Sequence, residues 1–170
     1  MSLVLAFLRL FVSRIRRNHA LEHATIHVLT SQNPYLSLIG YSDWKGFNIY
    51  GQLELEQLTQ AAQEALKRLK AGERHLAIHP RCGTVLATMG ILGGLVAFLT
   101  MGLSRSRSRF RWASLPDVLT ATTAGVVMGQ PVGLLLQQHL TTSADMGDLR
   151  IVRVFRQGQT SVPVLRVETH

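Results

Sequence analysis

The hydrophobic and polar positions near the start of the chain predict one helix that changes character along its length. Residues 2–13 are apolar nearly all round. As a helix they would span roughly 18 Å, which is too short for a bilayer core of about 30 Å. Arg14, Arg16 and Arg17 follow and are expected among lipid headgroups. We therefore predict an interfacial or re-entrant helix over residues 1–17 that continues into a polar helix ending near Thr30.

Residues 18–81 are predicted to form a small α/β surface region. Asn33-Pro34 should end the first helix. The turn residues 42–46 separate two short apolar segments and indicate a β-hairpin with its second strand at 47–50. Apolar residues then recur at three- and four-residue steps from Glu54 to Ala71, which predicts an amphipathic helix.

Two uncharged runs predict a transmembrane helical hairpin over residues 84–140. The runs cover about 84–103 and 118–138, lengths that suit a bilayer. Small residues at four-residue spacing favour close packing of the two helices, Gly90 and Gly94 in the first and Gly125, Gly129 and Gly133 in the second. A basic loop over 105–111 joins the two helices.

The C-terminal residues 149–169 predict a second β-hairpin around Gln157-Gly158-Gln159. This hairpin can pair with the first one. The predicted fold class is a mainly α membrane protein of α+β type. It combines an interfacial N-terminal helix, a surface region with β-hairpins and a two-helix transmembrane hairpin.

Composition supports the membrane assignment. Charged residues make up 16% of the chain, whereas a soluble domain has about 25%. The net charge of +8 comes from basic residues that are spread along the chain with few aromatics, so we expect contact with the lipid bilayer and no nucleic-acid partner. Cys82 is the single cysteine, so no intramolecular disulfide can form. The unpaired cysteine and the lack of a signal-peptide pattern favour cytoplasmic termini.

The stretch His-Ala-Leu-Glu-His-Ala-Thr-Ile-His at 19–27 is the main candidate for chemistry. On a helix its three histidines lie on one face, and Glu22 lies on the flank of that face. His19, Glu22 and His23 form the H-x-x-E-H pattern of inverted zincins, in which two imidazoles hold zinc and the carboxylate acts as the catalytic base. The alternative is a helix whose histidines face water or another subunit. His27 can be a metal ligand, a group that supports the ligands or a residue of such a polar face, and the last is expected.

A second group of ligand types lies just before the first membrane run. His79 and Cys82 are three residues apart, and Pro80 can fix the loop between them. Either side chain could be a third zinc ligand beside His19 and His23 at the membrane face. His75 is expected in an exposed turn and His139 at the membrane interface.

These two motifs resemble the YqhQ-like family of uncharacterised bacterial membrane proteins, which are regarded as predicted metal-dependent enzymes. The resemblance rests on His-Ala-Leu-Glu-His-Ala-Thr-Ile at 19–26 and His-Pro-Arg-Cys-Gly-Thr at 79–84, and it covers roughly positions 18–100. The chain is also similar to a largely cyanobacterial set of membrane proteins that share H-A-L-E-H-A-T. The resemblance implies His19, Glu22, His23, His79 and Cys82 as the site residues, in a bacterial inner or thylakoid-type membrane.

Two functions follow from this pattern. The first is a metal-dependent hydrolase in which Glu22 is the general base. The second is a non-catalytic scaffold or assembly factor, with a structural metal held by all four ligand residues or with no metal at all. The glycine stripe at Gly125, Gly129 and Gly133 could bind other membrane proteins or a second copy of the chain.

Overall fold

The chain folds into two compact units in the computed structural model, which describes residues 3–103, 114–158 and 163–170. The first unit comprises Met1–His79 and Gln138–His170, and the second comprises Pro80–Gln137. The predicted basic loop 105–111 and the hairpin-turn residue Gln159 lie outside the described residues.

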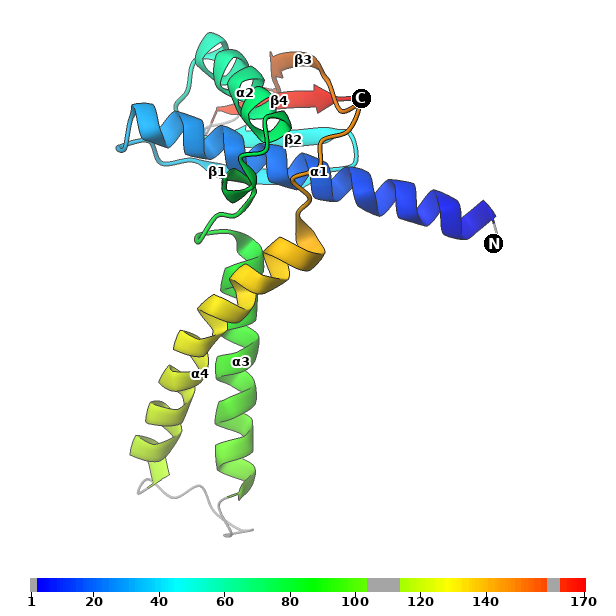
Figure 1. Cartoon of the computed structure of the whole chain (residues 1–170). Coiled ribbons are helices and arrows are strands. Elements are labelled where there is room, and N and C mark those ends of the chain that lie inside the picture. Colours follow the sequence, from blue (N-terminus) through cyan, green and yellow to red (C-terminus); the bar gives the residue numbers. More distant parts are fainter. Residues whose placement is uncertain (1–2, 104–113, 159–162) are drawn as a thin grey trace. The chain divides into compact units, whose positions relative to one another are not determined.

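The first unit contains α1, a single helix from Leu3 to Gln32 (Figure 1). The prediction of one helix running from the apolar N-terminal segment into the histidine motif is confirmed. Its first turns expose apolar side chains such as Phe7 and Leu10, which are 67% and 72% exposed. From Asn18 onward the helix is mostly buried in the unit.

Both predicted hairpins are present, and they join in one antiparallel sheet with the order β1-β2-β4-β3. The strands are β1 (Ile39–Asp43), β2 (Gly46–Tyr50), β3 (Ile151–Arg156) and β4 (Val164–Thr169). Gly46 opens β2 with a φ of 147° and lies so close to the Val167 carbonyl that a Cβ would overlap it. A glycine is therefore required at the turn that sets the register of the first hairpin.

One hydrophobic core lies between the helices and the sheet of the first unit. Alternate residues of β2 and β4, including Phe47, Ile49 and Leu165, are fully or almost fully buried. Helix α2 (Leu55–Lys70) buries Leu58 and its alanines in the same core. A short 3₁₀ helix, η1 (Arg74–Ala77), follows α2 and contacts α1.

Three arginines of α1, Arg14, Arg16 and Arg17, contact other parts of the first unit, and their contact with lipid headgroups stays a prediction. All three side chains reach the C-terminal part of the chain: Arg14 to the Thr169 carbonyl at 2.9 Å, Arg16 to the Thr142 carbonyl at 2.9 Å and Arg17 to the Asp148 carboxylate at 3.4 Å. The C-terminal segment folds back along α1 and supplies these acceptors, a long-range contact that local charge cannot reveal.

The buried Asn18 side chain links three segments of the first unit. Its amide donates to the Asp43 carbonyl at 2.8 Å, and its oxygen accepts from the Thr169 hydroxyl at 2.7 Å. Asn18 itself is fully buried. The residue next to His19 is thereby fixed to both hairpins, which limits movement of the histidine face.

The second unit is a helical hairpin of α3 (Gly83–Leu103) and α4 (Leu115–Leu136) (Figure 1). Helix α4 begins three residues before the predicted start because Pro116 occupies its first turn, where proline is favoured. A π-helical turn, η3 (Gln137–Thr141), continues it. Both helices are long and apolar enough to cross a membrane, over Gly83–Gly102 and Leu115–Thr141.

The structure confirms the predicted packing of the glycines in α4 and contradicts the prediction for those in α3. Gly125, Gly129 and Gly133 are buried, and their backbones lie against α3 near Leu92, Met89 and Val85. Gly90 and Gly94 have open space where a Cβ would be, and Gly93 is the α3 glycine that faces α4. Because α3 is apolar on every side, its sequence does not reveal which face packs.

Candidate metal centre

His19, His23 and His27 occupy one face of α1, as the helical spacing predicts. The ring centroids of His19 and His23 are 4.4 Å apart. A ligand nitrogen of one lies no more than 4.8 Å from a ligand nitrogen of the other. The first two histidines of the motif therefore form a close pair.

Two backbone carbonyl groups orient this histidine pair. His23 Nδ1 lies 2.8 Å from the Ala77 oxygen, and His19 Nδ1 lies 3.0 Å from the Thr141 oxygen. A carbonyl can only accept a hydrogen bond, so in each neutral imidazole Nδ1 donates and Nε2 carries the lone pair. Protein histidines that bind metals are oriented in this way, with one nitrogen donating to a carbonyl or carboxylate.

His23 is buried, with 2% of its surface exposed. Burial, together with repulsion from the neighbouring His19, lowers the pKa of His23 from 6.5 to about 3. The hydrogen bond to the Ala77 carbonyl opposes this shift without cancelling it. His23 is thus a neutral imidazole at physiological pH, the form in which a histidine binds a metal.

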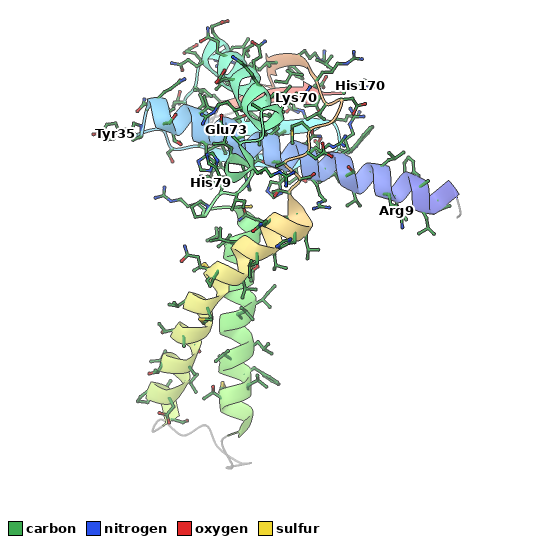
Figure 2. All side chains as sticks on the ribbon, in the orientation of Figure 1. Arg9, Tyr35, Lys70, Glu73, His79 and His170 are labelled. Atoms are coloured by element: carbon green, nitrogen blue, oxygen red, sulfur yellow. The ribbon has the colours of Figure 1, made fainter. Side chains whose placement is uncertain are left out.

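His79 is brought to the same face by η1 and lies beside α1 (Figure 2). Its ring centroid is 5.8 Å from that of His23 and 5.1 Å from that of His27. His27 Nε2 also lies 2.9 Å from the Ile78 carbonyl. His27 is therefore part of the histidine cluster, although its position in the sequence favoured a residue of a polar face. Its place one turn after His23 was the available signal.

Glu22 is buried, with 5% of its surface exposed. Its carboxylate lies against the backbone of Gly40 in β1, where any Cβ would overlap it. An isolated glycine inside a strand often marks such a close approach. Gly40 is therefore required beside Glu22, and its isolated position within a short strand is the signal in the sequence that marks it.

Cys82 belongs to the second unit, where it precedes α3 and is half-buried. Its sulfur accepts a hydrogen bond from the Thr84 N–H at 3.4 Å. Three of the four predicted metal ligands, His19, His23 and His79, thus lie together in the first unit.

The donors of the first unit suit a borderline-soft divalent cation. Zinc binds histidine nitrogens at about 2.1 Å, so two of them lie about 3.3 Å apart in a tetrahedral site. Ligand nitrogens of His19 and His23 lie within 4.8 Å of each other, which is close to that spacing. Oxygen-preferring cations such as magnesium are a poorer match for an imidazole pair.

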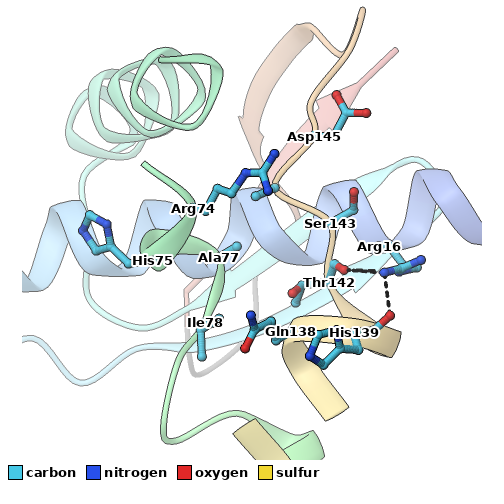
Figure 3. Close-up of a pocket in the computed structure, with 11 residues that line it drawn as sticks. Arg16, Arg74, His75, Ala77, Ile78, Gln138, His139, Thr142, Ser143 and Asp145 are labelled. Carbon is cyan, nitrogen blue, oxygen red and sulfur yellow. Dashed lines mark hydrogen bonds between the residues drawn. The ribbon is translucent and has the colours of Figure 1, made fainter. Parts of the chain in front are cut away.

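A cavity of about 480 Å³ lies in the first unit (Figure 3). Its wall includes Ala77 and Ile78, whose carbonyl groups accept hydrogen bonds from His23 and His27. Arg16, Arg74 and His139 also line it. The histidine cluster and this cavity therefore share the backbone of Ala77, the last residue of η1, and of Ile78, which follows it.

Comparison with known proteins assigns the chain to a family. The family described as "Domain of unknown function (DUF6391)" matches residues 14–154. The chain belongs to the DUF6391 family. The matched range contains the whole histidine motif, together with His79 and Cys82.

One relative is an uncharacterised protein from Picosynechococcus sp. (strain ATCC 27264 / PCC 7002 / PR-6). It is 34% identical over 152 residues, which cover 76% of this chain and 66% of that protein. The chain thus spans 66% of the length of this curated relative. No solved structure matches the chain.

Proposed function

We propose that this DUF6391 protein is a membrane protein that binds a divalent metal ion, zinc by its donor types, through His19 and His23. The observation that carries the proposal is the pair of Nδ1 contacts to the Thr141 and Ala77 carbonyls, which leaves the Nε2 lone pair of each imidazole as the ligand atom. A polar helix face without a metal would not need two adjacent histidines with the same tautomer and a buried, neutral partner.

His79 and Cys82 are proposed to complete the ligand set. His79 shares the histidine cluster through its ring contact with His23. Cys82 follows His79 by three residues, so its backbone is within roughly 10 Å of His79 along the chain. This His and Cys ligand set is characteristic of zinc sites. The same pairing of motifs supports the proposed kinship with the YqhQ-like family.

The metal-dependent hydrolase is the leading functional proposal. A catalytic zinc ion supplies Lewis acidity and makes water more acidic. In this proposal Glu22 is the general base that accepts a proton from water. The buried position of Glu22 and its close fit against Gly40 would hold its carboxylate in one place. Ester or amide substrates are the matching class.

A non-catalytic role is the second proposal, and the burial of His23 favours it. A metal ligand that is 2% exposed and fixed within the core is typical of structural sites. If His19, His23, His79 and Cys82 all bind, no position remains for water. The metal would then stabilise the fold of a membrane scaffold or assembly factor.

The membrane location is proposed from both units. The spans Gly83–Gly102 and Leu115–Thr141 expose most of their apolar side chains within the described structure, as lipid-facing helices do. In the first unit, Phe7 stacks on Phe11 and Phe11 lies tilted against Trp44, with ring centroids 6.4 Å apart in each pair. Lys45 lies 4.9 Å from the Trp44 ring. Aromatic and basic side chains of this kind concentrate at membrane interfaces.

We propose a bacterial inner or thylakoid-type membrane with both termini on the cytoplasmic side, since a chain with a single cysteine, which forms no intramolecular disulfide, suits a reducing compartment. His79 lies four residues before Gly83 in the chain, which supports a metal site at the membrane face.

Metal analysis of the detergent-purified full chain tests the metal proposal. We expect about one equivalent of zinc in the parent protein and at least a fivefold loss in His19→Ala and His23→Ala. His75→Ala is the matched control, because His75 is an exposed histidine of η1 outside the cluster. Circular dichroism identifies variants that fail to fold, and half-buried His19 is the safer of the two positions. A parent without metal, or folded variants that keep it, would refute the proposal.

Glu22→Gln separates the hydrolase from the structural proposal. The Glu22→Gln variant should retain zinc whether the metal is catalytic or structural, because Glu22 is not one of the proposed ligands. If the protein is a hydrolase, cleavage of fluorogenic ester and amide substrates by the zinc-loaded parent should fall by about 100-fold or more. If zinc is structural, no hydrolysis occurs, Glu22→Gln complements a deletion strain, and chelation lowers the melting temperature.

A further inference from the structure

The cavity of the first unit is built from three separate parts of the chain. One wall is Arg16 of α1, another is the 74–78 segment of η1 and its following residues, and the third is the 138–145 segment after α4 (Figure 3). Its volume of about 480 Å³ is typical of pockets for small organic ligands. A single inorganic ion would fill only a small part of it.

The charge of the cavity wall is positive. Arg16 and Arg74 contribute two permanent cations, and Asp145 contributes the one carboxylate among the lining residues. Asp145 lies 3.9 Å from Arg17, which offsets its charge. The wall therefore favours an anion.

Arg16 is held in position by carbonyl groups that do not neutralise it. Its Nε and Nη2 atoms donate to the Thr142 oxygen at 3.2 and 2.9 Å, and Nη2 also donates to the His139 oxygen at 2.9 Å (Figure 3). These bonds use at most three of the five guanidinium N–H groups. Within the described residues Arg16 has no carboxylate partner. A preoriented guanidinium of this kind suits an oxyanion.

Other hydrogen-bonding side chains line the cavity beside these two cations. The Gln138 amide, the Ser143 hydroxyl and the imidazoles of His75 and His139 line the same cavity. A ligand that satisfies so many donors must offer several acceptor oxygens. A phosphate group offers more of them than a carboxylate and pairs well with arginine.

We propose that this cavity binds the phosphate group of an organic phosphate ligand, with Arg16 and Arg74 as its charge partners. The ligand could be a phospholipid headgroup or a soluble phosphate ester, because both present the same phosphate chemistry. His139 lies in the candidate span Leu115–Thr141, near its end, where a lipid headgroup would be within reach. The proposal does not require the metal, although Ala77 and Ile78 connect the cavity wall to the histidine cluster.

Calorimetry of the detergent-solubilised full chain tests soluble phosphates, with inorganic phosphate and glycerol 3-phosphate as probes. Native mass spectrometry after reconstitution in nanodiscs of phosphatidylcholine and phosphatidylglycerol tests lipid headgroups. Arg74→Gln is the main variant, because Arg74 is exposed and its loss should not disturb the fold. Arg150→Gln, an exposed arginine of the same unit outside the cavity, is the matched control.

We expect Arg74→Gln to weaken phosphate binding or phosphatidylglycerol retention about tenfold, the loss of one charge-assisted contact, while Arg150→Gln has no effect. Arg16→Gln should weaken it at least as much if it folds. Binding in the calorimetric arm alone identifies a soluble ester, and retention in the nanodisc arm alone identifies a headgroup. No binding in either arm, or equal losses in Arg74→Gln and Arg150→Gln, would overturn the proposal. Chelator-treated protein should give the same affinities, which separates this result from the outcome for the metal.

Discussion

The two units of this chain use similar apolar residues for opposite purposes. In the first unit apolar side chains such as Phe47 and Leu165 turn inward to a core, and the buried polar Asn18 and His23 have specific partners. In the second unit large side chains such as Phe98 and Ile91 turn outward, and glycines form the inner seam. This difference is the one expected if the second unit lies in a membrane, as proposed above.

Removing one phenylalanine from each unit should give the largest contrast. Phe47→Ala deletes a fully buried ring of the first unit and should lower the free energy of unfolding by about 4 kcal/mol. Phe98, which is 74% exposed, is the matched residue in the second unit. Phe98→Ala should cost less than about 0.5 kcal/mol in detergent. Chemical unfolding followed by circular dichroism measures both, and equal losses would contradict the inward–outward contrast.

Adding one methyl group to the glycine seam should have a smaller effect, confined to the second unit. A Cβ at Gly129 would overlap the Met89 backbone, so Gly129→Ala should destabilise the α3–α4 pair by about 2 kcal/mol. Gly90→Ala is the control, because a Cβ there meets open space. Resistance of the helical pair to SDS reports this change. If both variants behave alike, the packing face of α3 has been assigned wrongly.

The smallest expected effect is a pH dependence that belongs to the first unit. In metal-free protein the pKa of His23 is about 3 when folded and 6.5 when unfolded, so the unfolded state binds the extra proton between these values. The stabilising effect of His23 is complete above pH 6.5 and is lost as the pH falls toward 3. Between pH 6.5 and 5.5 the loss should be about 1 kcal/mol.

Urea unfolding of the chelated parent and of a His23→Leu variant measures this effect, since groups outside the histidine cluster titrate alike in both proteins. The difference in slope between the two proteins is the contribution of His23. A parent whose stability changes no more steeply than that of the variant would show that folding does not lower the pKa of His23.

Local pattern was sufficient to predict most elements. Residue spacing predicted α1, α2 and both hairpins, since amphipathic periodicity and turn residues act over a few neighbouring positions. It also predicted the long apolar helices α3 and α4. Residue spacing predicted that Gly90 and Gly94 of α3 pack against α4, whereas Gly93 does so in the structure. An all-apolar helix has no periodicity that marks its packing face.

The sequence by itself determined which residues of α1 share a face, and so placed His19, His23 and His27 in one row. The sequence also predicted His79 as a further candidate metal ligand. Only the tertiary structure decided the rest: the carbonyls of Ala77 and Thr141 that set the tautomers, the fit of Glu22 against Gly40, and the burial that keeps His23 neutral. These features depend on backbone groups distant in the chain. Every residue has the same carbonyl, so no residue type marks which one will reach an imidazole.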